Sequence, residues 1–101
     1  MIMQAVIKVH PGSAYRKWNG KVQNVAQLLP GMVAIEMQDK NVWADFTFKE
    51  VTILNFDHHI QAAFDAYNWY GNAETRRNLA SLEAYAKFKG IAYKLVQNCP
   101  A

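Results

Sequence analysis

The period of the hydrophobic pattern changes near residue 55, and this change constrains the fold more than any other feature of the chain. Before it, apolar residues largely alternate with polar ones, which is typical of strands with one buried face. After it, apolar residues recur every three or four positions, as in an amphipathic helix. A run of strands followed by a run of helices predicts an α+β fold and disfavours alternating βαβ units.

The first 54 residues predict an antiparallel sheet or small barrel of about four to five strands. Short turn signals separate the apolar segments, among them Asn19-Gly20 and Pro30-Gly31, as in antiparallel hairpins. One segment breaks strict alternation, which a β-bulge would accommodate. We expect a polar hairpin connection at 38–41 and strands over 2–9, 21–28, 32–37, 42–48 and 51–54.

Residues 56–89 predict a helical hairpin packed on the sheet. The first helix ends near Tyr70, capped at its start by Asn55 or Asp57. Asn72 offers a side-chain cap to a second helix over 73–89, which Gly90 ends. Residues 91–97 alternate again and predict a C-terminal strand.

The composition favours one folded, cytoplasmic domain over residues 1–101. The chain is 51% hydrophobic and only 19% charged, a balance that argues against intrinsic disorder. It has one cysteine, so it cannot form an internal disulfide. We find no signal peptide and no apolar run of about 18 residues, and therefore expect no membrane association.

Several turn and strand residues resemble those of a known family. Gly20-Lys21-Val22 opens the second predicted strand, Gly31-Met32-Val33-Ala34-Ile35 forms the third, and Glu50-Val51-Thr52-Ile53-Leu54 closes the set. Residues 7–54 thus resemble a small five-stranded barrel of the Src homology 3-like or KOW type, although the glycine that KOW motifs carry between Gly12 and Gly20 is absent. The resemblance implies binding of nucleic acid or short peptides through loops and exposed aromatics, without catalysis.

The segment from His10 to Lys21 gathers aromatic and cationic side chains in one loop. Bases stack on rings while phosphates pair with cations, so this combination suits single-stranded nucleic acid. Tyr, Trp and Arg are also common anchors of protein interfaces. In the structural alternative, Trp18 lies in the core and the charges are only solvated. The candidate binding residues are His10, Tyr15, Arg16, Lys17, Trp18, Lys21 and Trp43.

Asp57, His58 and His59 form the densest group of metal-ligand residue types. Adjacent residues on a helix point about 100° apart, so the two histidines do not chelate as an i, i+4 pair does. His10 and Cys99 could join them only through the fold. We expect no metal, no cofactor and no catalytic residue. A small metal-dependent enzyme built around the two histidines is the enzymatic alternative.

These observations predict a small non-enzymatic binding module that contacts a protein partner or a second copy of itself. The net charge of +3 is small for a dedicated nucleic-acid binder, so nucleic acid is the second hypothesis. The spacing of the aromatic cluster at 64–70 directs Phe64 and Tyr67 toward the core and leaves Trp69 on another face. An exposed aromatic face of this kind would favour a homodimer.

Overall fold

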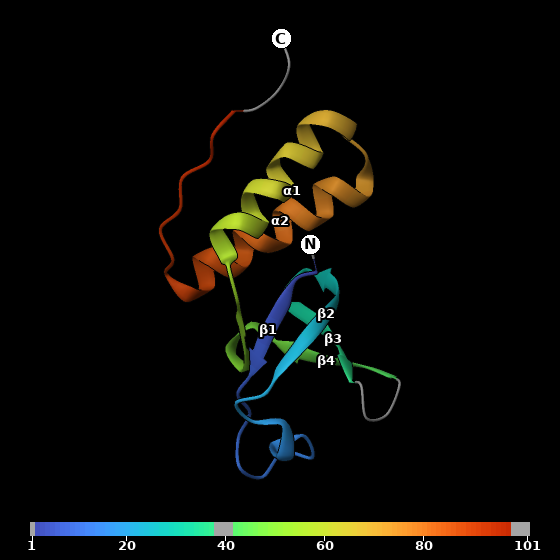
Figure 1. Cartoon of the computed structure of the whole chain (residues 1–101), viewed down its shortest axis with the longest axis vertical. Coiled ribbons are helices and arrows are strands. Elements are labelled where there is room, and N and C mark those ends of the chain that lie inside the picture. Colours follow the sequence, from blue (N-terminus) through green and yellow to red (C-terminus); the bar gives the residue numbers. More distant parts are fainter. Residues whose placement is uncertain (1, 38–41, 98–101) are drawn as a thin grey trace. The chain divides into compact units, whose positions relative to one another are not determined.

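The computed structural model describes residues 2–37 and 42–97 of the 101-residue chain (Figure 1). By their internal contacts these residues form two compact units. The sheet unit comprises residues 2–27, 32–37 and 42–54, and the helical unit comprises residues 28–31 and 55–97. The main boundary coincides with the change of hydrophobic period, and the α+β class is as predicted. The expectation of one domain over 1–101 stays a prediction.

Within the described ranges, five antiparallel strands form an open sheet in the order β4-β3-β2-β1-β5. Their bounds are β1 Gln4–Ile7, β2 Val22–Leu29, β3 Met32–Met37, β4 Val42–Thr47 and β5 Val51–Ile53. The tight turn between β2 and β3 requires a positive φ of 80° at Gly31, which a residue with a Cβ adopts only at a cost. The predicted connection at 38–41 lies outside the described residues.

The register of the sheet separates a buried face from an exposed one. Ala5 of β1 lies opposite Ile53 of β5, and Ile35 of β3 lies opposite Ala44 of β4; all four are buried. Their neighbours along the strands point to the opposite face, because side chains alternate along a strand. The alternation predicted from the sequence is therefore confirmed for β1, β4 and β5. In β3, Val33, Ile35 and Met37 share the buried face as predicted, but Ala34 on the opposite face is buried as well.

The predicted strand over 42–48 ends one residue early. Phe48–Glu50 form a 3₁₀ turn, η2, in which the Thr47 backbone N–H donates to Glu50 Oε1 at 3.0 Å. The turn reverses the chain before β5, whose partner is β1 and not β4. A capping box therefore directs the last strand to the other edge of the sheet.

The helical hairpin is also confirmed. Helix α1 spans Phe56–Tyr70 and helix α2 spans Ala73–Lys89, and the rings of Phe56 and Tyr85 lie 5.5 Å apart. Asn72 Oδ1 accepts a hydrogen bond from the Thr75 N–H at 2.9 Å, as the predicted cap requires. Asn55 occupies the N-cap position of α1 in a left-handed conformation, but its side chain makes no cap bond. The alternative cap, Asp57, lies inside the first turn of the helix.

The predicted C-terminal strand was wrong as well. Residues 91–97 run as irregular chain (Figure 1). The Ile91 N–H donates to the Ala86 carbonyl of α2 at 2.9 Å, and Val96 pairs with α1. The Gln61 side-chain amide donates to the Val96 carbonyl and accepts from the Val96 N–H, both at 2.8 Å. A primary amide offers the same donor and acceptor as a peptide group, so Gln61 supplies the pairing that a neighbouring strand would have given.

Candidate binding surfaces

The loop between β1 and β2 is fixed at its base by main-chain pairing. The Gly20 N–H donates to the Ile7 carbonyl at 2.8 Å, and the Ile7 N–H donates to the Lys21 carbonyl at 3.2 Å. Asn19 Oδ1 accepts from the Val9 N–H at 2.6 Å. These bonds extend the β1–β2 hairpin, so the side chains that the loop carries project from a rigid support.

Trp18 lies in the core of the sheet unit and is only 1% exposed. It ends a 3₁₀ turn, η1 (Arg16–Trp18), whose geometry turns the ring inward. The Tyr15 ring packs between Trp18, at 5.9 Å, and Phe46 of β4, at 5.2 Å. The structural alternative is therefore right for Trp18: its ring is an anchor of the loop and is closed to a partner.

The basic residue types of the loop remain outside. His10, Arg16, Lys17 and Lys21 are exposed, and we call these four residues the basic loop. Lys17 Nζ lies 4.3 Å from the centroid of the Trp18 ring, a cation–π contact that orders the Lys17 side chain over the anchor. The aromatic and cationic parts of the predicted site are thus divided between the interior and the surface. A role of the basic loop in binding stays a prediction.

Trp43 belongs to a different surface. It is 62% exposed on β4, opposite Glu36 of β3 in the register, and Asp45 follows two residues later on the same face. Phe46, three positions from Trp43, points to the other face and contacts Tyr15. The sheet therefore separates Trp43 from the aromatics of the loop. We call Glu36, Trp43 and Asp45 the Trp43 face.

The aromatic cluster of α1 divides as predicted. Phe64 and Tyr67 are half-buried, whereas Trp69 is 61% exposed and Tyr70 is also exposed. Trp69 and Tyr70 occupy the last turn of α1, just before the left-handed Gly71 that ends the helix. A second exposed aromatic site thus lies in the helical unit.

The two adjacent histidines have different environments. His58 is exposed and His59 is buried, with the ring centroids 5.4 Å apart. Burial, and secondarily the charge of His58, lowers the pKa of His59 below its ordinary value of 6.5. Among the described residues no three His, Cys, Asp or Glu side chains are grouped as a metal site would need. Cys99 lies outside the described residues.

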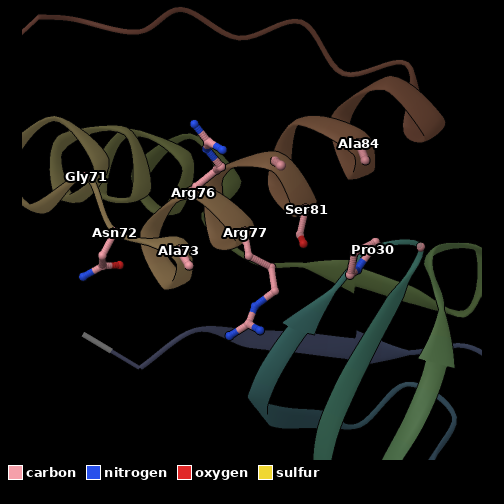
Figure 2. A pocket seen from close by; sticks show the side chains of 10 residues that line it. Pro30, Gly71, Asn72, Ala73, Arg76, Arg77, Ser81 and Ala84 are labelled. Carbon is pink, nitrogen blue, oxygen red and sulfur yellow. The ribbon is translucent and has the colours of Figure 1, made fainter.

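The helical unit contains a pocket of about 530 Å³ that was not predicted from the sequence (Figure 2). Small residues of α2, Ala73, Ala80 and Ala84, supply much of its wall, and Arg76, Arg77 and Ser81 supply most of its polar groups. The available signal was the spacing: positions 73, 77, 80, 81 and 84 form one stripe of α2, and this stripe carries no large apolar side chain. The remaining lining residues are Pro30, Gly31, Gly71 and Asn72.

Comparison with protein families, curated proteins and solved structures finds no match to this chain. The resemblance to Src homology 3-like barrels therefore stays an expectation. Neither of the two described helices combines the length and low charge needed to cross a membrane.

Truncation of the anchor should destabilise the protein. Trp18→Ala is expected to lower the free energy of unfolding by about 3–5 kcal/mol, because it leaves a large cavity beside Tyr15. Trp43→Ala is the matched control and should change it by no more than about 0.5 kcal/mol, since that ring is exposed. Urea denaturation followed by far-UV circular dichroism measures both values. Equal effects of the two substitutions would contradict the core position of Trp18.

Stability should fall as the pH is lowered toward 5. Because the folded-state pKa of His59 lies below 6.5, the unfolded state takes up the proton first. The stabilisation is fully present above about pH 6.5 and is lost as the pH falls through the folded-state pKa. His59→Gln should flatten this dependence in urea titrations between about pH 5 and 7.5. His10→Gln, which removes an exposed imidazole, is the control; an unchanged slope in His59→Gln would contradict the assignment.

Proposed function

We propose that this chain is a non-enzymatic binding module that contacts a basic segment of a protein partner through the Trp43 face. The observation that carries the proposal is the exposure of Trp43 on the edge strand β4, with Glu36 of β3 opposite it and Asp45 two residues further along β4. A tryptophan that is 62% exposed leaves a large apolar surface in water, and tryptophan is enriched among the residues that dominate binding energy. With Trp18 buried, Trp43 is the exposed tryptophan of the sheet unit.

The charge around Trp43 favours a cationic partner. Directly opposed residues of an antiparallel pair have Cβ atoms about 4.5–5.5 Å apart, so the Glu36 carboxylate lies within reach of a group that covers the Trp43 ring. Asp45 adds a second carboxylate on the same face. A lysine or arginine over the ring would gain a cation–π contact and a charge-assisted hydrogen bond together.

The position of β4 favours an extended partner. β4 is an edge strand of the described sheet, and edge strands present main-chain groups to which an extended peptide can add. The resemblance of residues 7–54 to Src homology 3-like barrels also implies recognition of short peptides through exposed aromatics. We therefore take the partner to be an extended segment with at least one lysine or arginine.

The test is binding to an array of extended decapeptides that carry one lysine or arginine in varied contexts. For peptides that bind, Trp43→Ala should raise the Kd at least about tenfold, the effect of losing one interface anchor. Glu36→Gln combined with Asp45→Asn should weaken binding severalfold and reduce its salt dependence. The control is Trp69→Ala, which removes an equally exposed tryptophan from the helical unit.

Two results would contradict this function. One is the absence of binding to any basic peptide of the array. The other is an equal loss of binding in Trp69→Ala and Trp43→Ala. A second copy of the chain could also supply the cations, because its basic loop has the charge that the Trp43 face attracts. Light scattering of the wild type and of Arg16→Glu/Lys17→Glu separates this self-association from a foreign partner.

Nucleic acid is the second candidate, favoured by the exposure of Arg16, Lys17 and Lys21 in the basic loop. The burial of Trp18 removes the ring on which a base would stack, so phosphate contacts would have to carry the affinity. We expect a 20-nucleotide oligothymidylate to bind in the non-specific range, with a Kd of about 10⁻⁴–10⁻⁶ M at physiological salt. Arg16→Glu/Lys17→Glu should abolish that binding. Nanomolar affinity unaffected by Trp43→Ala would instead make nucleic acid the partner.

A further inference from the structure

We infer that the pocket along α2 binds a small molecule that carries a phosphate or carboxylate group. The pocket is lined by residues of the helical unit alone and lies at the N-terminal half of α2 (Figure 2). It shares no residue with the basic loop or the Trp43 face, so this site is independent of the proposed peptide contact.

The electrostatics of the site favour an anion. α2 begins at Ala73, and the first turn of a helix carries the positive end of its dipole. The Asn72 side chain accepts from the Thr75 N–H, and the N–H groups of residues 73 and 74 take no part in that cap bond. Helix N-termini bind oxyanions through such groups. Arg77 adds a guanidinium group, which can bind an oxyanion through two parallel hydrogen bonds.

A buried hydroxyl in the wall is the second, independent observation. Ser81 is 1% exposed, and its Oγ has no hydrogen-bond partner among the described residues. Burial without a partner costs stability, because the hydroxyl has given up its bonds to water. Ser81 stands one turn beyond Arg77, and Figure 2 shows both side chains pointing the same way from α2, whereas Arg76 points elsewhere. Ser81 lies two turns beyond residue 73, about 12 Å along the helix axis. An oxyanion that Arg77 holds beside Ser81 would therefore give this hydroxyl its acceptor without contacting the N–H groups of the first turn.

The remaining wall leaves room for the body of a ligand. A volume of about 530 Å³ lies within the range of small-molecule sites. The short side chains of Ala73, Ala80 and Ala84 leave space along α2, and Gly71 and Pro30 line the same pocket. This wall is small and largely apolar, and it has no aromatic side chain on which a base could stack. The arrangement therefore suits a compact organic anion better than a nucleotide.

The test is an ¹H–¹⁵N correlation titration of the intact chain with phenyl phosphate, benzoate and benzyl alcohol at constant ionic strength. The two anions should shift the amide signals of residues 72–77 and 81, whereas the neutral alcohol should not. The anion that binds with the lower Kd identifies the preferred headgroup. Arg77→Gln should raise the Kd at least about tenfold and Ser81→Ala about fivefold. Arg16→Gln removes an exposed arginine of the basic loop and should leave the Kd unchanged.

Two further variants distinguish binding in the pocket from a general attraction of anions to a positively charged protein. Ala84→Leu fills the pocket. It should weaken the binding of phenyl phosphate more than the binding of inorganic phosphate, because only phenyl phosphate needs room for a ring. Ser81→Ala should keep or raise the melting temperature, since it removes a hydroxyl that has no partner. The inference is overturned if neither anion shifts these amides, if benzyl alcohol shifts them equally, or if Arg16→Gln weakens binding as much as Arg77→Gln.

Discussion

β1 is hydrogen-bonded to β2 on one side and to β5 on the other, and these two pairings determine which side chains of the sheet unit are buried. A slip of one residue in either pairing would turn the buried Ala5 and Ile7 outward, because side chains alternate between the faces of a strand. The same pairing closes the base of the loop between β1 and β2 through Gly20 and Ile7. The placement of Trp18, Tyr15 and the basic loop therefore depends on the register of β1.

The side chains of the loop between β1 and β2 are buried or exposed according to their polarity. The Trp18 ring fills the interior and is covered by Tyr15, while the basic loop stays solvated. Lys17 joins the two parts, with its ammonium over the buried indole. The tryptophan of the loop is closed to stacking, and this leaves the exposed Trp43 as the stronger candidate for contact with a protein.

Strand pairing satisfies the main chain of the sheet unit. In the helical unit, a helix cap and a side-chain amide bond main-chain groups instead. Asn72 caps α2, and Gln61 substitutes for a strand in pairing with Val96. α2 also carries small residues on the stripe that lines the pocket and large buried ones, Leu82 and Tyr85, on another side. Because the residues on one side of α2 are small, the pocket lies next to the N-terminal end of this helix.

The sequence by itself determined the α+β class, the five described strands to within a few residues and both helices, because hydrophobic period and turn chemistry are local properties. Tertiary structure decided the rest. Whether Trp18 is an anchor or a contact depends on Tyr15 and on Phe46, which is distant in the sequence, and the separation of Trp43 from the loop depends on strand register. Residues 91–97 have a strand-like pattern, yet their main chain is paired by Gln61, thirty-five positions before Val96. The pocket needs the turn at Pro30 and the α2 stripe together, and only folding joins segments so far apart in the chain.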